Sequence, residues 1–395
     1  MSAITIIFWL SVAIIFYSYL GYGILLYLII LLKRTFIRKE IEGSDGIEPE
    51  ITVLIAAYNE LFYLQRKVDN TLALDYPMDK LKVLFVTDGS DDGSYEFLSD
   101  IQEVDVLHDN ERKGKISAMN RGMKHVSSPI VVFTDCNTDL GVHSIRTIAN
   151  LFGDEKVGCV SGEKRIVTNE KDAASGSGEG IYWRYESQLK KMEAELSSTI
   201  GAAGELFAIR TDLFREVEQD TLLDDFIISL RVAIDGYKIK YDPAAYAIES
   251  ASLNVKEELK RKIRIAAGAV QSVFRLKTLL NPFKHGWLSI QYISHKFLRW
   301  MITPILLLAI IPLNVLLILE DGSEKQLYIY LLVLQLAFYL IALIGWYLEN
   351  RKIRLKILFI PYYFFIMNLA MYLGFFRYLK GNQSVKWEKA KRLNN

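Results

Sequence analysis

The chain of 395 residues carries 47 lysines and arginines against 46 aspartates and glutamates, so its formal net charge at pH 7 is +1. Nucleic-acid-binding proteins usually show a basic bias, and this balance gives no indication of one. Hydrophobic residues make up 51% of the chain, which is above the usual share in soluble proteins, and they are concentrated in blocks at the two ends. The middle has the composition of an ordinary α/β enzyme and is long enough to bury a full core.

The first apolar block runs from about Ile4 to Leu32. It is too long for the apolar region of a signal peptide and no basic region precedes it, so residues 1–34 are predicted to form a retained transmembrane helix. By the positive-inside rule its end faces the cytosol, because basic residues follow it directly: Lys33, Arg34, Arg38 and Lys39. The polar residues 35–48 are interpreted as a linker.

From residue 49 to residue 282, short apolar segments alternate with helical patterns. Continuous apolar runs are typical of parallel strands buried on both faces. They lie at Ile51–Ala57, Lys82–Thr87 and Ile130–Thr134, with Val104–Leu107 as a weaker fourth candidate. Helical patterns lie between them at Leu61–Ala73, Ser94–Ile101 and Lys115–His125. This alternation predicts an α/β domain with a mostly parallel sheet and helices on both faces, which binds ligands at the carboxyl ends of its strands.

The stretch Ala173–Gly180 is rich in small residues and glycine. It lacks the lysine and the spacing of a phosphate-binding loop, so it is predicted to be a mobile surface loop. The following segment, Ile181–Leu196, has apolar residues at helical spacing and is predicted to form an amphipathic helix.

Toward the C-terminus, residues 283–299 mix aromatic and basic residues, which is typical of a helix in the membrane interface. Three apolar spans are predicted to follow at about 300–319, 327–348 and 355–376, with a basic tail at 377–395. Three full crossings would place that tail outside, whereas its basic residues favour the inside. Pro361 and Asn368 make the last span the weakest candidate for a crossing, and the sequence leaves both arrangements open.

The strand at Ile130–Thr134 is followed by Asp135 and Asn137. In extended geometry residues i and i+2 point to the same side, so this pair would offer two oxygen ligands to one hard cation. Cys136 between them is expected to point into the sheet. By itself the segment also fits an ordinary strand that ends in a polar turn.

Two further segments carry polar residues at the ends of predicted strands or the start of a helix. Asp88 ends a strand and is predicted to contact a nucleotide, whereas Asp91 and Asp92 are predicted to cap the next helix. Lys115 stands at a helix start, where the helix dipole disfavours a cation. A bound anion would offset that effect, so Lys115 is predicted to contact a phosphate.

Asp224 and Asp225 are adjacent acids within the apolar stretch Leu222–Leu230. Burial raises the pKa of a carboxylate toward the range that suits a general base. Asp225 is therefore the candidate base, and Asp224 is interpreted as an ordinary acid of a first helical turn. The five histidines are scattered without metal-binding spacing, and the two cysteines, Cys136 and Cys159, have no redox spacing.

Taken together, these motifs resemble family 2 glycosyltransferases with the GT-A fold, the group that contains cellulose, chitin, hyaluronan and poly-N-acetylglucosamine synthases. The resemblance covers roughly Pro49 to Gly268. ITVLIAAYNE (Ile51–Glu60) resembles the family's first strand, TDGSDDGS its uridine-contacting turn and KGKISAMNRG its diphosphate segment. TDCN resembles its metal-binding position, GAAGELFAIR (Gly201–Arg210) its acceptor-side loop and following strand, and LDDF its catalytic acidic pair.

This resemblance implies an inverting, metal-dependent hexosyltransferase with a nucleotide-sugar donor, UDP-linked, and Mg²⁺ or Mn²⁺ as cofactor. It implies that Asp225 is the base and that Asp135 and Asn137 bind the metal. Donor contacts are implied for Ala57, Asn59, Glu60, Asp88, Lys115, Asn120, Asp135 and Arg264. An acceptor-side role is implied for Gly204, Glu205 and Asp224.

Two positions depart from the family pattern. Asn137 replaces the second metal-binding aspartate, and its neutral amide is expected to weaken metal affinity. The Gln-x-x-Arg-Trp signature of processive synthases appears as RKIRI (Arg261–Ile265), which keeps only its arginine, Arg264. Because the missing tryptophan stacks on the acceptor sugar in that family, the resemblance does not extend to processive polymerisation.

The expected setting is an integral protein of the bacterial inner or plasma membrane with a cytosolic catalytic domain. The acceptor is expected to be a glycan or a lipid-linked molecule in cell-surface polysaccharide synthesis, with export-complex proteins as further partners and no nucleic acid. Two alternatives stay open: transfer of a single sugar to a polyprenyl phosphate, and a catalytically silent membrane scaffold of a polysaccharide export complex.

Overall fold

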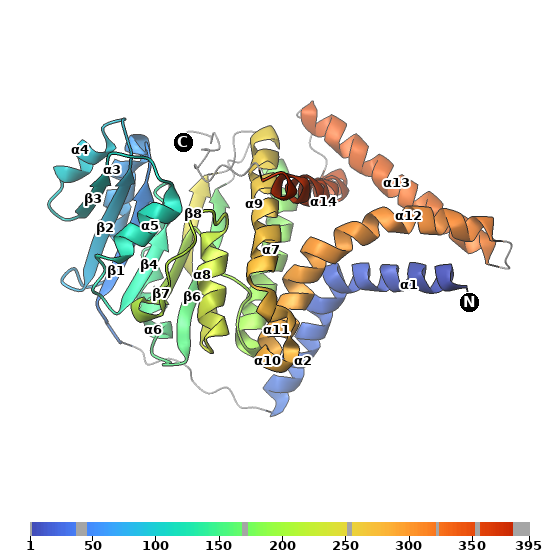
Figure 1. The fold of residues 1–395 in the computed structure, drawn as a ribbon, viewed down its shortest axis with the longest axis horizontal. Helices are drawn as coiled ribbons and strands as arrows, with labels where there is room; N and C mark the ends of the chain where they lie inside the picture. Colours follow the sequence, from blue (N-terminus) through green and yellow to red (C-terminus); the bar gives the residue numbers. More distant parts are fainter. Residues whose placement is uncertain are drawn as a thin grey trace.

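The computed structural model describes residues 2–36, 46–167, 173–250, 255–320, 324–351 and 356–381. A mixed eight-stranded sheet with helices on both faces lies at one end of the molecule, and long apolar helices lie at the other (Figure 1). The strand order is β3-β2-β1-β4-β7-β6-β8-β5. The predicted α/β class with flanking apolar helices is confirmed.

The four strands predicted from apolar runs are present as β1 (Ile51–Ala57), β2 (Leu81–Asp88), β3 (Asp105–Asp109) and β4 (Ile130–Thr134). All are parallel to their neighbours among the four. Residues of the first three predicted helices form α3 (Leu61–Leu72), α4 (Ser94–Ser99) and α5 (Lys115–Met123). Because parallel strands end at the same edge of a sheet, the residues that follow β1, β2 and β4 gather there.

The other half of the sheet adds antiparallel pairings, so the sheet is mixed, with four parallel and three antiparallel pairings. This half contains β5 (Thr138–Leu140), β6 (Val157–Val167), β7 (Leu206–Arg210) and β8 (Lys238–Ser250). Strand β7 is antiparallel to both β4 and β6, β6 is parallel to β8, and β5 is antiparallel to β8. Only β7 was expected, as the strand after the acceptor-side loop.

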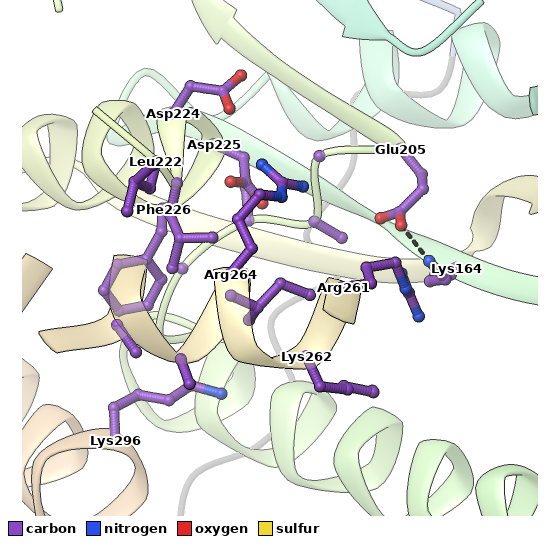
Figure 2. Close-up of a pocket in the computed structure, with 18 of the residues that line it drawn as sticks. Lys164, Glu205, Leu222, Asp224, Asp225, Phe226, Arg261, Lys262, Arg264 and Lys296 are labelled. Carbon is purple, nitrogen blue, oxygen red and sulfur yellow. Dashed lines mark hydrogen bonds and ion pairs between the residues drawn. The ribbon is translucent and has the colours of Figure 1, made fainter. Parts of the chain in front are cut away.

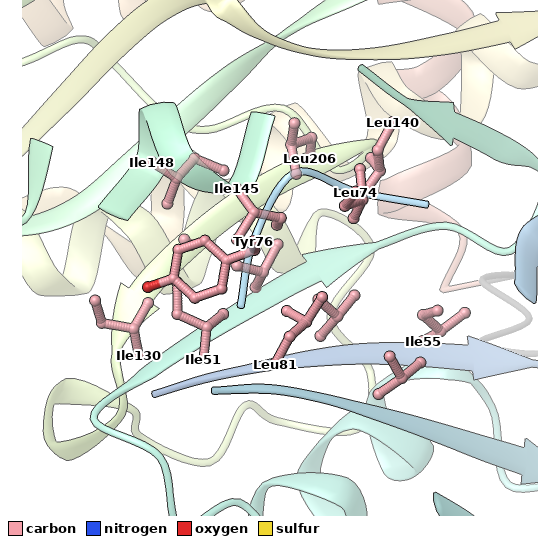
Figure 3. Packing of buried hydrophobic residues seen from close by; sticks show 14 of the residues in the cluster. Ile51, Ile55, Leu74, Tyr76, Leu81, Ile130, Leu140, Ile145, Ile148 and Leu206 are labelled. Atoms are coloured by element: carbon pink, nitrogen blue, oxygen red, sulfur yellow. The ribbon is translucent and has the colours of Figure 1, made fainter. Parts of the chain in front are cut away.

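Two hydrophobic cores cover the two faces of this sheet. One joins the strands to α3, α4 and α6 (Ser144–Leu151), and Figure 3 shows residues from it, among them Ile55, Ile145 and Ile148. The buried Cys136 belongs to it, so the expected inward orientation of this side chain is confirmed. The other core joins the strands to α5 and α8 (Asp224–Ile234), which fixes the acidic start of α8 beside the sheet.

Helices α7 (Ala173–Leu196) and α9 (Val255–Arg275) stand between the sheet and the apolar helices (Figure 1). The predicted loop at Ala173–Gly180 is wrong, since α7 includes these residues. Each glycine in a helix costs about 1 kcal/mol relative to alanine. The later turns of α7 bury Leu189 against Tyr22 and Leu26, and this packing favours the helix.

The N-terminal apolar segment comprises α1 (Ala3–Phe16), the π-helix η1 (Tyr17–Gly21) and α2 (Tyr22–Phe36). The predicted interfacial segment contains α10 (Pro282–His285) and α11 (Trp287–Tyr292) and runs on without a break through the π-helix η5 (Ile293–Ile302) into α12 (Thr303–Leu319). Helices α13 (Lys325–Asn350) and α14 (Lys356–Leu379) follow, and short 3-10 turns lie at Thr211–Leu213 and Lys277–Leu280.

Among the described residues, three helices are long and apolar enough to cross a membrane: Ala3–Phe36, Trp287–Leu319 and Lys325–Glu349. Helix α14 is not one of them. It packs across α9 so closely that a Cβ on Gly374 would lie 2.5 Å from the Cβ of Ala266. The expected basic tail lies outside the described residues except for its first five positions.

Candidate active site

A cleft of about 340 Å³ opens where β4 ends, the loop before β7 turns and α8 begins. Figure 2 shows side chains of α8 and α9 facing one another across it. Of the predicted site residues, it brings together Lys115, Asp135, Gly204, Glu205, Asp224, Asp225 and Arg264. These positions span 150 residues of sequence from first to last, so the fold alone makes them neighbours.

Lys115 joins the acids of two different elements. Its Nζ lies 2.8 Å from Oδ1 of Asp135, after β4, and 3.5 Å from Oδ2 of Asp224, at the start of α8. Burial alone would lower the pKa of Lys115, but Asp135 and Asp224 outweigh it and raise this pKa above its usual value. Lys115 is therefore a permanently charged cation inside the cleft, as a phosphate contact requires.

Asp225 stands beside this ion pair without a cation of its own at ion-pair distance among the described residues. Burial, and then the charge of Asp224, raises its pKa to about 7, although Lys115 opposes the shift. A Cβ on Gly204 would lie 3.4 Å from the Asp225 carboxylate, so the missing side chain there keeps one side of the carboxylate open. A carboxylate with this pKa accepts protons efficiently near neutral pH.

The predicted metal pair has a different geometry from the one expected. Residues 135–137 do not continue the extended strand: they form a turn in which the Thr138 hydroxyl donates to the Asp135 carbonyl over 2.8 Å. As a result Asp135 faces the main cleft, whereas Asn137 lines a separate small cavity beside Tyr63 and Arg66. The same-side argument from strand alternation was wrong, because alternation ends where the strand ends.

A divalent cation nevertheless fits the donor set of the cleft. No group of three or more His, Cys, Asp or Glu side chains in the described residues is arranged to hold a metal by itself. Mg²⁺ and related ions are commonly held by one or two carboxylates, with substrate phosphates completing the shell. Asp135, with Asp224 on the other side of Lys115, supplies that kind of incomplete hard-oxygen set.

A smaller hollow continues from the cleft past Lys115. It is lined by the ends of β1 and β2, including Ala57 and Asp88, and by Tyr58 and Arg112. The Arg112 guanidinium lies 3.8 Å from the centre of the Tyr58 ring. Asp88 is held there by the backbone amides of Lys113 and Gly114, which donate to its carboxylate. This aromatic and polar hollow has the character of a nucleobase site, and sequence reasoning did not identify Tyr58 or Arg112.

Three predicted donor contacts lie apart from these cavities. Asn59 has a positive φ of 52° and its side chain bonds to Asp91, which fixes the turns after β1 and β2. The backbone amide of buried Glu60 donates to the Ser94 hydroxyl. Asn120 is paired with both backbone groups of Val217.

The cleft also carries an ion-pair cluster whose lysine, Lys164, the sequence did not single out. Lys164 of β6 is buried and forms ion pairs with Glu205 and with Glu249 of β8. Lys164 outweighs burial and lowers the pKa of Glu205 to about 2. Arg261 pairs with Glu258 over 2.9 Å and lines the cleft together with Ile265 and Arg264. No local pattern marked Lys164, because no strand was predicted over β6.

Known proteins share both the sequence pattern and the fold. The family profile described as "Glycosyltransferase like family 2" matches residues 49–268. The poly-beta-1,6-N-acetyl-D-glucosamine synthase of Staphylococcus aureus is 26% identical over 259 residues, 61% of this chain and 61% of that protein. The probable glycosyltransferase YdaM of Bacillus subtilis is 28% identical over 249 residues, 60% of this chain and 58% of that protein.

The matched part thus spans about three fifths of the length of these curated relatives. A solved structure, the mannosyltransferase PcManGT from Pyrobaculum calidifontis in complex with GDP-Man and Mn²⁺, superposes with a TM-score of 0.67 at 20% identity. It covers 95% of this chain and 100% of that one, which shows a shared fold.

Proposed function

The chain belongs to the family 2 glycosyltransferases, and we propose that it transfers a hexosyl group from a nucleotide sugar, UDP-linked, to an acceptor at the membrane with inversion at the anomeric carbon. The observation that carries this proposal is the cleft itself. A carboxylate with a pKa of about 7, Asp225, stands next to the Lys115–Asp135 ion pair, and the hollow at Asp88 continues from the same lysine.

In the proposed reaction Asp225 accepts the proton of an acceptor hydroxyl as that oxygen bonds to the anomeric carbon. The bond from this carbon to the donor diphosphate breaks in the same step, which inverts the configuration. Lys115 and Arg264 hold the departing diphosphate, since both are cations that line the cleft. Both also interact electrostatically with Asp135 and Asp224, which places them near the proposed metal ligand. Asp88 orients the nucleobase from the far side of Lys115.

Asp135 would hold Mg²⁺ or Mn²⁺, with Asn137 as the weaker candidate because it lines a different cavity. Such a cation, when bound, supplies positive charge to the diphosphate oxygens. The mannosyltransferase of similar fold was solved with Mn²⁺ and GDP-Man, which supports a divalent cofactor.

We also propose that Ala3–Phe36, Trp287–Leu319 and Lys325–Glu349 cross the inner or plasma membrane of a bacterium and that the catalytic domain is cytosolic. Basic residues after the first of these helices favour this orientation. The acceptor is then a glycan or a lipid-linked molecule in cell-surface polysaccharide synthesis, as the relationship to the Staphylococcus aureus synthase suggests. Export-complex proteins are the expected further partners.

Transfer of one sugar to a polyprenyl phosphate is the second candidate. It is favoured by Ile265, which lines the cleft at the position of the tryptophan in the processive signature, and by the apolar residues of α14 that line the same cleft. The length of radiolabelled product separates the two: one sugar per lipid, or a ladder of increasing length.

A thermal-shift screen of nucleotide sugars tests the proposal. The full-length protein in detergent is heated with each donor in the presence and absence of Mn²⁺. A donor that binds the folded state raises the melting temperature according to its affinity. We expect a metal-dependent shift with UDP-linked sugars. The silent-scaffold alternative predicts that no donor shifts the melting temperature and that no donor is hydrolysed or transferred.

A further inference from the structure

The cleft has a direction, because Lys115 is shared by the cleft and the nucleobase hollow. A donor whose nucleobase occupies that hollow would extend along Lys115 and Asp135, with its sugar near Asp225. The cleft continues beyond Asp225 between α7, α9, η5 and α14. In Figure 2, Lys262 and Lys296 lie on the opposite side of Arg264 from Asp225. This continuation is the part of the cleft left for an acceptor.

Lys190 of α7 lines this continuation and is 8% exposed. Among the described residues its ammonium group forms no ion pair and no hydrogen bond, and it lies 5.7 Å from the centre of the Tyr241 ring. Burial, and then Lys296, lowers the pKa of Lys190, although nearby carboxylates, Glu186 first among them, oppose the shift. A buried ammonium without a carboxylate partner is costly, and proteins retain such groups mainly where something binds them.

The cations around Lys190 add to the positive potential at this end of the cleft. Lys296 pairs with Glu186 over 2.6 Å, and the same carboxylate lies 3.4 Å from Arg299 and 2.9 Å from His295. Lys262, 6% exposed, has Glu258 at 3.4 Å. The Glu186 carboxylate thus serves several cations at this end of the cleft, and neither it nor Glu258 forms an ion pair with Lys190.

From this arrangement we propose that the distal end of the cleft binds an anionic group of the acceptor, a phosphate or a carboxylate, through Lys190 with Lys262 and Lys296. An anion placed there completes the missing ion pair and is held away from Asp225, so the acceptor hydroxyl that reacts is a separate part of the molecule. Apolar side chains line the same cleft, among them Trp300, Met367 and Met371. The acceptor is therefore an anionic molecule with an apolar or sugar portion, and this inference rests on the proposed function.

The test measures equilibrium binding of matched acceptor probes to the full-length protein in detergent. Geranylgeranyl phosphate is compared with geranylgeraniol, and tetragalacturonate with its neutral methyl ester. At least one anion should bind at least ~10-fold tighter than its neutral partner, since truncating one side of a buried charge pair commonly has an effect of this size or larger. The pair that shows the preference identifies the source of the anion as lipid or glycan.

Variants assign the preference to Lys190. Lys190→Met should remove it, Lys190→Arg should retain it within about threefold, and Lys191→Met, which changes the exposed neighbour on α7, should leave it unchanged. Lys190→Met should also melt at or above the temperature of the wild type, because it removes an unpaired buried charge. The proposal is overturned if neither anion is preferred, or if Lys190→Met and Lys191→Met weaken binding equally.

Titration of the same samples with UDP and Mn²⁺ separates this inference from the proposed function. Nucleotide binding that Lys190→Met leaves intact, together with the loss of anion preference, supports both. Nucleotide binding without any anion preference overturns the distal subsite alone. An anion preference that depends on Lys190, without nucleotide binding, supports the subsite and contradicts the proposed donor.

Discussion

At the scale of single residues, the raised pKa of Asp225 leads to a defined pH dependence. Burial and Asp224 hold this pKa at about 7 in the free enzyme. Below that pH the carboxyl group is protonated and does not accept a proton, so kcat/KM should fall about tenfold per unit as the pH decreases from 7. A radiolabel transfer assay between pH 5.5 and 8.5 measures this slope, and a flat profile below pH 7 would exclude Asp225 as the base.

Lys67 of α3 holds the turn that contains Asp135, the proposed metal ligand. Its buried ammonium group donates to the Thr138 carbonyl over 2.8 Å and to the Thr134 hydroxyl over 3.1 Å, on either side of Asp135. Burial lowers its pKa to about 8. Lys67→Met leaves this carbonyl unpaired, so it should lower the stability by about 1–3 kcal/mol and raise the Mn²⁺ concentration for half-maximal activity.

The exposed Lys124→Met is the matched control for Lys67→Met, because its ammonium group lies on the surface beside Glu216. It should change neither the melting temperature nor the Mn²⁺ dependence. An unchanged Mn²⁺ dependence in a destabilised Lys67→Met variant would show that Lys67 is structural only.

Residues near the active centre were predictable where their immediate sequence neighbours made them unusual. Asp225 was identified because acids in an apolar stretch are unusual, and Lys115 because it opens a helix. Asn120 was selected by motif alone, and its side chain instead pairs with the backbone of Val217. Lys164 and Lys190 could not be identified, since their positions in the cleft depend on how β6 and α7 pack.

At the scale of elements, the close approach of α14 to α9 shapes the end of the cleft at which we propose the acceptor binds. Gly374 of α14 has no room for a side chain against Ala266 and the backbone of Ala267. Gly374→Val should push α14 away from α9 and displace Met371, which lines the cleft. The acceptor KM should then rise several-fold while UDP binding stays the same.

Leu373→Val is the control for Gly374→Val, because Leu373 is exposed on the same helix and its substitution leaves the α9 contact in place. Equal acceptor KM values for the two variants would contradict a role for this contact in acceptor binding.

Elements in the first half of the sheet were predictable from period and composition, since β1 and β4 match the expected ranges. Apart from β7, the strands of the second half were not predictable, because β6 and β8 carry polar residues that interrupt an apolar run. The π-helices were also missed. In η1 and η5 the carbonyl of Ser18 accepts from Arg299 over 2.8 Å, a tertiary contact that no local pattern reveals.

At the scale of the whole molecule, the proposed topology has three crossings and an α14 that lies against α9, which would place the end of α14 on the cytosolic side. This arrangement agrees with the basic tail. Both native cysteines, Cys136 and Cys159, are buried, so single cysteines can be introduced and labelled. Glu324→Cys, between α12 and α13, should react with a membrane-impermeant maleimide in intact cells.

Gly381→Cys, after α14, should react only when the cells are permeabilised. Labelling of Gly381→Cys in intact cells would mean that α14 crosses the membrane and that the tail is external.

The central claim, sugar transfer with Asp225 as the base, is tested most directly by single-turnover transfer with Asp225→Asn. The rate should fall by about 10²- to 10⁴-fold, with the affinity for UDP and Mn²⁺ nearly unchanged. Because the folded pKa of Asp225 lies above its usual value, its ionised form disfavours folding above pH 7, so the variant should be at least as stable as the wild type at pH 8. The exposed Asp212→Asn should transfer at the wild-type rate. Full transfer by Asp225→Asn would contradict the account.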